Sequence, residues 1–502
     1  MRQRIFISYS FLNEATGDNR VMQNYYQFII PRLNGSEIRK KFGCYRALVR
    51  KGIAGFIVFG GELKTLRKYL TDLQRESELP LIIASDLEQG LGQQVKGGTL
   101  FPPAMALASA VKGIQNSKFK IQNLRLLRAS FKAIAAEAKY TGINTIFAPV
   151  LDVNTNPRNP IISVRAFGED PETVSFFGCE MIREFQACGV AACGKHFPGH
   201  GDTEVDSHIR LPVVDKGLRS LKKSELRPFQ RAIEAEVKMI MLGHLSVPAL
   251  DSTGIPVSFS KKAVRFLREK MKYNGLLITD AMNMGGIGVF SEEQAAFMSL
   301  DAGVDIVLHP TDPEKVVSYL EAKNIAFDAE RLKQFRTELG SGRAGTTPRF
   351  ELHRKLSDLL TEKAVRLTTD FRITGDLFLL ILNDDEQRKG LALVRALKEK
   401  IPSLKARILR QGADIRKVKI PDASFVIAAV FSETRAWKGG AGSRLHKQIA
   451  NVQDRADLFV SFGSPYIFRN DKKRLKTAKI FAYWDSESAQ RAAAKIIGEK
   501  SG

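Results

Sequence analysis

GVAACGKHFPGHGDTEVDSH, residues 189–208, joins an apolar run to a loop crowded with ionisable side chains. The apolar run ends at Cys193, and prolines and glycines interrupt the chain from Pro198 onward. Three of the chain's seven histidines lie in this stretch, beside Lys195. Ionisable groups at this density are costly to bury and do not help packing. The stretch therefore predicts a strand that runs into a functional loop.

The same pattern of an apolar run followed by an amphipathic helical stretch recurs along the first two thirds of the chain. Runs of this kind are typical of strands buried on both faces of a parallel sheet. With an eighth strand expected near the N-terminus, they predict a (β/α)8 TIM barrel, and the strand count favours it over a doubly wound sheet. The seven runs are 54–60, 80–86, 145–153, 189–197, 237–245, 275–282 and 304–310.

The length of 502 residues exceeds what one ordinary core accommodates, so we expect two domains. ELGSGRAGTTPRF, residues 338–350, is rich in Gly, Ser, Thr and Pro and reads as a linker. A catalytic barrel over 1–337 would precede it, and a smaller α/β domain over 351–502 would follow. The strand-like runs of that second domain are 376–384, 424–431, 457–465 and 478–484.

Composition limits the class of protein. Hydrophobic residues at 44% and charged residues at 26% describe a folded globular chain. The N-terminus resembles neither a signal peptide nor a membrane span, and four cysteines without metal-ligand spacing fit reduced thiols, so we expect a cytoplasmic location and no membrane partner. The net charge of +23 would suit a nucleic-acid-binding protein, but the basic residues are scattered and no binding motif is present, so we expect no nucleic-acid partner. The sequence contains no Walker loop and no GxGxxG after a strand, so it does not indicate a nucleotide cofactor.

Polar side chains stand at or near the carboxyl end of most of these runs. In barrels that end carries the active site. The residues are Asp86, Asp152, Lys195, His196, His244, Asp280 and His309.

Asp206 and His208 are two residues apart on one loop. A carboxylate there can accept the Nδ1 proton of the imidazole and raise the basicity of the ring, which gives a general acid/base. Asp280, at the end of GLLITDA, could be a nucleophile, a metal ligand or the N-cap of a helix. Asp86 could bind hydroxyl groups or cap the next turn.

Arg165 lies in NTNPRNPIISVRAFGEDP, residues 154–171. It could present a rigid fork of donors to hydroxyls or a carboxylate, or it could pair with Glu169 or Asp170. A metal-dependent hydrolase is a further alternative, because several ionisable residues could surround zinc. These are His196, His200, Asp202, His208 and Asp280.

Read together, KHFPGHGDTEVDSH, the APVLDV run with NPRNPIISVRAFGEDP, and ITDAMNMGGI resemble glycoside hydrolase family 3. They are similar in particular to its β-N-acetylglucosaminidases, whose DxH loop the family's β-glucosidases lack. The resemblance covers about residues 50 to 310 and implies a retaining hydrolase without metal or cofactor. The implied substrate is a carbohydrate with a terminal non-reducing β-GlcNAc, by analogy a cell-wall (peptidoglycan) fragment.

The resemblance also implies roles for individual residues. Asp280 would be the nucleophile, His208 the general acid/base and Asp206 its partner. Phosphorolysis stays open, because a neutral histidine base repels an incoming phosphate less than a carboxylate would. A β-glucosidase activity on the same fold is a further alternative. Asp86, Arg165, Lys195 and His196 would hold the sugar, and Asp152 and His200 would support the loop.

One segment departs from the family pattern. Relatives usually follow the first-site aspartate with a GGRV-like stretch and a second arginine, whereas this chain reads DLEQGLGQQV at 86–95. Leu91 and Gln94 stand where basic residues are expected. We therefore expect the sugar subsite to differ from that of the relatives.

Overall fold

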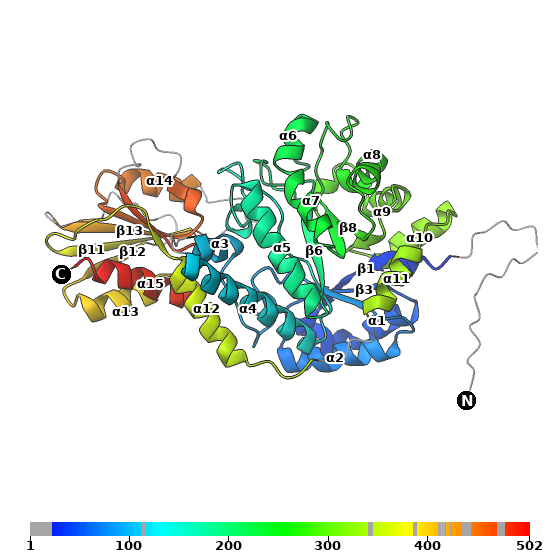
Figure 1. The fold of residues 1–502 in the computed structure, drawn as a ribbon, viewed down its shortest axis with the longest axis horizontal. Helices are drawn as coiled ribbons and strands as arrows, with labels where there is room; N and C mark the ends of the chain where they lie inside the picture. The colour runs from blue at the N-terminus through cyan, green and yellow to red at the C-terminus, as the bar shows by residue number, and fades with distance from the viewer. Residues whose placement is uncertain are drawn as a thin grey trace, which may run out of the picture.

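The computed structural model shows two α/β units, with α12 (Phe350–Ala364) packed where they meet (Figure 1). It describes residues 23–501 apart from gaps at 113–116, 340–344, 385–388, 410–412, 414, 416–417, 422–423, 433–442 and 469–476. Within these residues no helix combines the length and apolar character that a bilayer crossing requires.

The first unit is a closed ring of parallel strands. Its sheet has nine short strands in the order β1-β9-β8-β7-β6-β5-β4-β3-β2. Pro31 separates β1 from β2, so these two form one barrel strand that pairs with β9 on one side and with β3 on the other. The (β/α)8 prediction is confirmed, including the eighth strand near the N-terminus. The bounds are β1 (Ile29–Ile30), β2 (Arg32–Asn34), β3 (Gly55–Phe59), β4 (Ile82–Ser85), β5 (Thr145–Ile146), β6 (Ala191–Phe197), β7 (Met239–Leu242), β8 (Leu276–Ala281) and β9 (Ile306–Leu308).

Amphipathic helices surround the ring. In α2, for example, Leu66, Leu70 and Leu73 lie on one face at helical spacing and are all buried. The helix α5 begins at Pro171, and Asp170 caps it by accepting the backbone N–H of Thr173. The helices are α1 (Ile38–Arg50), α2 (Leu63–Glu76), α3 (Ala104–Lys112), α4 (Ser117–Thr141), α5 (Pro171–Ala187), α6 (Leu218–Lys223), α7 (Leu226–Glu234), α8 (Lys261–Arg265), α9 (Glu292–Asp301), α10 (Pro313–Lys323) and α11 (Glu330–Leu339).

The second unit is built on a sheet in the order β10-β15-β14-β13-β11-β12, in which only the β10–β15 pairing is antiparallel. The four expected strands are present, whereas β10 and β12 were not predicted. The reason for β12 is that it is an edge strand whose first three residues are exposed, so it lacks an apolar run. The elements are β10 (Arg366–Leu367), β11 (Leu377–Asn383), α13 (Leu391–Lys400), β12 (Lys405–Leu409), β13 (Phe425–Ser432), α14 (Ser443–Val452), β14 (Leu458–Gly463), β15 (Ala478–Phe481) and α15 (Glu487–Gly498).

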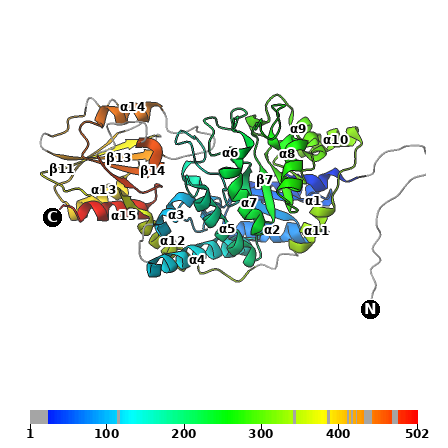
Figure 2. The same cartoon turned by 45° about the horizontal axis from the view of Figure 1, so that its top comes forward.

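Helix α12 follows the expected linker and packs on the barrel. Leu360 and Ala364 belong to the barrel's hydrophobic core. Ser357 Oγ donates to the carbonyl of Leu100 at 2.7 Å, and His353 Nδ1 lies 2.7 Å from Glu137 Oε1. Figure 2 shows α12 beside α3 and α4 on one side and close to α15 on the other. The helix therefore serves both units.

Two contacts bring the second unit to the carboxyl end of the barrel. Ser163, in the loop after β5, donates its hydroxyl to Ser464 Oγ at 2.9 Å, just after β14. Tyr483, just after β15, donates its hydroxyl to Ser109 Oγ of α3 at 3.2 Å. The carboxyl ends of β14 and β15 therefore face the end of the barrel where the sequence predicts the site.

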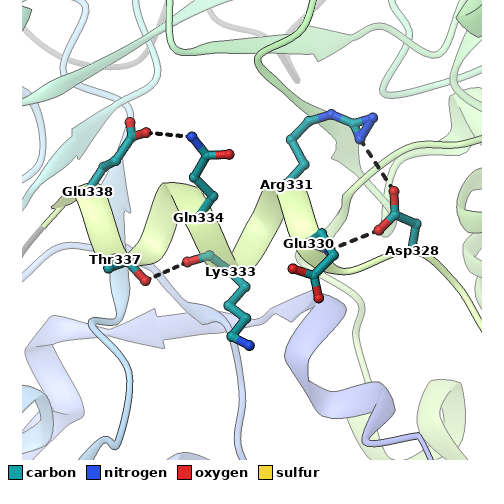
Figure 3. Close-up of a pocket in the computed structure, with 7 residues that line it drawn as sticks. All are labelled: Asp328, Glu330, Arg331, Lys333, Gln334, Thr337 and Glu338. Carbon is teal, nitrogen blue, oxygen red and sulfur yellow. Dashed lines mark hydrogen bonds and ion pairs between the residues drawn. The ribbon is translucent and has the colours of Figure 1, made fainter.

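A hollow along α11 lies at the other end of the barrel, where Arg336 donates to the carbonyls of Leu79 and Pro80 ahead of β4. Its side chains mostly bond to one another: Gln334 donates to Glu338, and Arg331 pairs with Asp328 (Figure 3). Most of the polar side chains in this hollow are therefore already engaged in hydrogen bonds or ion pairs with their neighbours.

Candidate active site

A cavity of about 1120 Å³ opens at the carboxyl ends of the barrel strands. Most of the residues that the sequence analysis selected line it. Asp152 and Asp206 do not line it but bond to histidines that do. The lining includes Asp86, Arg165, Lys195, His196, His200, His208 and Asp280.

Four charged side chains form what we call the buried ion network: Asp86, Glu88, Arg165 and Lys195. Lys195 is buried, and the other three are partly buried. Lys195 Nζ lies 2.7 Å from Asp86 Oδ1 and 2.8 Å from Glu88 Oε1. Arg165 donates to both oxygens of Glu88, at 2.9 and 2.8 Å. The alternative that Arg165 pairs with Glu169 or Asp170 is therefore wrong, because Glu88 takes up the guanidinium fork.

Glu88 is the central residue that the sequence analysis missed. It stands two positions after Asp86, a spacing that places side chains on the same side of an extended chain and could have suggested it. Burial raises the pKa of Glu88, but the charges of Arg165 and Lys195 outweigh burial and hold that pKa well below its usual value. Burial lowers the pKa of Lys195, and Asp86 with Glu88 raises it above its usual value overall. Glu88, Arg165 and Lys195 are therefore ionised at neutral pH.

Asp152 holds two histidines below the cavity. Its Oδ2 lies 2.7 Å from His196 Nδ1, and its Oδ1 accepts the backbone N–H of His200 at 2.7 Å. The ring of His200 lies between Thr203 Oγ1 at 2.7 Å and Ser207 Oγ at 3.0 Å. Burial is the main cause that lowers the pKa of His200 to about 4. His200 is therefore a neutral bridge that shapes the loop, and Asp152 orients the ring of His196.

Asp206 and His208 form a close pair on the loop after β6. Asp206 Oδ1 lies 2.8 Å from His208 Nδ1 and also accepts the backbone N–H of His208 at 2.8 Å. The carboxylate is buried, whereas 35% of the His208 side chain is exposed. Because Asp206 engages Nδ1, Nε2 is the nitrogen of His208 that can exchange a proton with a ligand.

Asp280 lies at the carboxyl end of β8 and lines the cavity. Its Oδ1 accepts the backbone N–H of Ala281 at 2.8 Å, and the N-cap of the next short helix (Gly285–Ile287) is Met284. The helix-cap alternative for Asp280 is therefore wrong. Burial raises the pKa of Asp280, but the nearby His196 and His244 and the Ala281 N–H outweigh it and keep the pKa below its usual value. The cavity thus holds an ionised carboxylate that no Lys or Arg of the described chain neutralises.

The asparagine-rich segment explains how the loop keeps its shape. Asn159 Nδ2 donates to the carbonyls of His200 and Thr203 at 2.8 and 2.9 Å. Thr155 Oγ1 donates to Asp202 Oδ1 at 2.9 Å. On the other side, the backbone N–H of Gly285 donates to the carbonyl of His208 at 3.2 Å, and a Cβ on Gly285 would meet backbone oxygens at 3.0 Å or closer.

The zinc alternative requires several ligand side chains to lie close together. Across the residues that the structure describes, no three His, Cys, Asp or Glu side chains gather in a way that could hold a metal ion. Asp202, one of the residues considered for zinc, instead accepts from Thr155 and pairs with Lys216 at 3.1 Å.

The second unit supplies one wall of the cavity, which the sequence analysis did not predict. Lys389 Nζ pairs with Asp485 Oδ2 at 3.2 Å on this wall. The indole N–H of Trp484 is buried, and no described atom accepts its hydrogen bond. The wall consists of Lys389, Phe462, Gly463, Tyr483, Trp484 and Asp485.

The unusual DLEQGLGQQV segment divides between core and cavity. Leu91 is fully buried in the barrel core. Gln94 lines the cavity together with Gln89 and Gln93, and Gln93 Oε1 accepts the backbone N–H of Gln89 at 2.9 Å. Neutral amides therefore occupy the side of the cavity where a second arginine was expected.

The fold and the site define the class of protein: it is a parallel (β/α)8 barrel whose ionisable residues surround a cavity at the carboxyl ends of the strands. Residues 31–334 match the glycosyl hydrolase family 3 N terminal domain, and the chain belongs to glycosyl hydrolase family 3.

Three similar proteins illustrate this membership. The β-hexosaminidase A of Pseudoalteromonas piscicida is 35% identical over 282 residues, 52% of this chain and 46% of that protein. The chain thus spans about half the length of this relative. The β-hexosaminidase of Idiomarina loihiensis is 30% identical over 304 residues, 60% of this chain and 89% of that protein. A solved family 3 β-N-acetylglucosaminidase from Paenibacillus sp. shares the fold, with a TM-score of 0.77 and 24% identity over 96% of this chain and 97% of the other.

Proposed function

We propose that the protein is a retaining β-N-acetylhexosaminidase that removes terminal non-reducing β-GlcNAc, with cell-wall (peptidoglycan) fragments as the natural substrate. The observation that carries the proposal is that the Asp206–His208 pair, Asp280 and the buried ion network all meet at one cavity. The names of relatives such as the Idiomarina β-hexosaminidase support the choice of sugar.

The first step needs a carboxylate beneath the anomeric carbon and a proton donor at the leaving oxygen. Asp280 is ionised because His196 and His244 lower its pKa, so it can attack the anomeric carbon. The bond to the leaving oxygen breaks as His208 Nε2 donates its proton to that oxygen. The product of this step is a glycosyl ester on Asp280.

The second step reverses the roles. His208, now neutral, accepts a proton from a water molecule whose oxygen attacks the anomeric carbon, and the ester bond to Asp280 breaks. Asp206 stabilises the imidazolium that forms, through the 2.8 Å contact to Nδ1. A histidine thus replaces the second carboxylate of the usual scheme.

The buried ion network would hold the sugar while this happens. Asp86 offers carboxylate oxygens and Lys195 and Arg165 offer N–H donors, a mixture that suits hydroxyl groups. Their mutual ion pairs fix the side chains before the substrate arrives, which lowers the entropy cost of binding. His196, oriented by Asp152, would complete this grip.

Substituting Asp280→Ala tests the nucleophile. Turnover of 4-nitrophenyl β-GlcNAc should fall by about 10³-fold or more, because Asp280 is the one carboxylate that β8 carries into the described cavity. Asp328→Asn, on the exposed rim of the hollow along α11, is the matched control and should keep full activity. Substantial turnover by Asp280→Ala would refute the assignment, and NMR of the first-formed anomer tests retention.

Three further assays separate the alternatives. Product identification with and without phosphate distinguishes GlcNAc from GlcNAc 1-phosphate, and hence hydrolysis from phosphorolysis. Comparing nitrophenyl GlcNAc with nitrophenyl glucose tests the β-glucosidase alternative. Activity that disappears with a chelator would overturn the metal-free mechanism.

A further inference from the structure

Three side chains from neighbouring barrel strands line the cavity but have no part in the proposed reaction. Arg32 begins β2, Phe59 ends β3, and His309 follows β9. The strand pairings β9–β1 and β2–β3 make these strands neighbours, so the side chains come from one side of the barrel. We call Arg32, Phe59 and His309 the Arg32 patch.

Among the residues that the structure describes, Arg32 differs from the other basic side chains of the cavity in its lack of an ion-pair partner. Arg165, Lys195 and Lys389 lie 2.8, 2.7 and 3.2 Å from a carboxylate oxygen. No carboxylate in the described part of the chain lies within ion-pair distance of Arg32. The positive charge of Arg32 is therefore available to a molecule in the cavity.

The patch also holds the guanidinium in place. Arg32 Cζ lies 4.8 Å from the centroid of the Phe59 ring, a cation–π contact that restrains the long side chain. Stacking on a ring leaves the N–H donors at the edge of the guanidinium plane free, and their fork matches the oxygens of a carboxylate or a phosphate.

His309 adds a donor without adding charge. Its ring centroid lies 5.9 Å from that of Phe59. Burial, and after it the charge of Arg32, lowers the pKa of His309 to about 4. The imidazole is therefore neutral at pH 7 and can donate one hydrogen bond.

We propose that the Arg32 patch binds an oxyanion, a carboxylate or a phosphate group, of a molecule that occupies the cavity. The oxyanion is either an acidic group on the saccharide or inorganic phosphate. The first source rests on the proposed function, and it makes the enzyme selective for acidic β-GlcNAc saccharides over neutral ones.

The substrate arm compares two disaccharides, N,N′-diacetylchitobiose and the same disaccharide with a lactyl carboxylate on its reducing sugar. Arg32→Gln should lower kcat/KM for the acidic disaccharide about tenfold or more, which is the value of one charge-assisted hydrogen bond, and leave the neutral one within about twofold. Arg32→Lys keeps the charge without the fork, so its kcat/KM for the acidic disaccharide should lie between those of wild type and Arg32→Gln. The matched control is Arg39→Gln, because Arg39 is exposed on α1 and, among the described residues, donates to the hydroxyl of Thr65 at 3.3 Å.

The phosphate arm needs no turnover. Calorimetry measures the affinity of wild type and Arg32→Gln for inorganic phosphate. Weaker phosphate binding by the variant, with an unchanged ratio of acidic to neutral turnover, assigns the patch to phosphate. Unchanged phosphate binding by the variant, with a lower ratio of acidic to neutral turnover, assigns the patch to the saccharide.

The proposal is overturned if Arg32→Gln changes neither phosphate affinity nor the acidic-to-neutral ratio, or if the wild type has neither property. Failure of the proposed function is recognised separately. In that case the wild type cleaves no β-GlcNAc compound at all, and the calorimetric arm still decides whether the patch binds an oxyanion.

Discussion

The buried ion network and the Asp206–His208 pair serve one cavity but are held in different ways. In the network every charge has an opposite charge beside it, and only 3% of the Lys195 side chain is exposed. In the pair a single carboxylate holds a histidine of which 35% of the side chain is exposed. In the proposed mechanism the network only binds the sugar and can be neutralised by its own ion pairs, whereas His208 transfers protons to water and needs one open face. The comparison predicts different consequences when each part is altered.

The largest effect is expected at the open part of the site. His208→Ala should lower kcat about 10²–10⁴-fold, because general acid/base catalysis typically contributes that much. KM should change little, since His208 is not part of the buried ion network. Steady-state kinetics on 4-nitrophenyl β-GlcNAc measures both parameters. A rise in KM with an unchanged kcat would instead place His208 among the binding residues and break the comparison.

An effect on stability is expected in the buried part. Glu88→Gln removes the carboxylate between Lys195 and Arg165 and leaves the buried Lys195 and the partly buried Arg165 short of a partner. Loss of one partner of a buried pair costs about 3–5 kcal/mol of unfolding free energy. Urea denaturation at pH 7 measures this cost. The control Glu330→Gln, on the exposed face of α11, should stay within about 0.5 kcal/mol of wild type. A cost near zero would show that the network does not act as a unit.

A smaller, pH-dependent effect is expected at His200. The pKa of His200 in the folded state is about 4, below the ordinary 6.5. Between these two pH values the imidazole is therefore protonated in the unfolded chain but neutral in the folded chain. The contribution of His200 to the free energy of unfolding is complete above pH 6.5 and decreases as the pH falls toward 4. Between pH 7 and pH 5 it decreases by about 2 kcal/mol. His200→Asn should flatten that part of the pH profile. Denaturation curves at several pH values measure it, and an unchanged slope would contradict the prediction.

The strands and their polar ends were predictable because each depends on a short stretch of sequence. Residues 189–197 read as a strand, and β6 (Ala191–Phe197) lies within them. Exposed β12 escaped prediction because an edge strand has no apolar run. The expected second domain begins at 351, but α12 packs on the barrel, since its apolar face finds a partner in α3 and α4 that no local pattern reveals.

The site divides in the same way. The spacing of Asp206 and His208 on one loop suggested an acid/base pair, whereas the role of Asp280 came only from the family resemblance. Glu88 was missed since its importance comes from Arg165, 77 positions away. The sequence also left open whether Asp280 caps a helix, and only the structure, in which Met284 is the N-cap of the next short helix, decides against that role.

By itself, the sequence determined the barrel, the end of the barrel that holds the chemistry, and a loop with a histidine and a carboxylate. These follow from periodicity and residue type, which act over a few residues. The tertiary structure alone decided which charges neutralise one another, that Trp484 and its neighbours form one wall of the cavity, and that no carboxylate of the described residues pairs with Arg32. Ion pairing and enclosure depend on distances between segments far apart in the chain, and only the folded chain sets those distances.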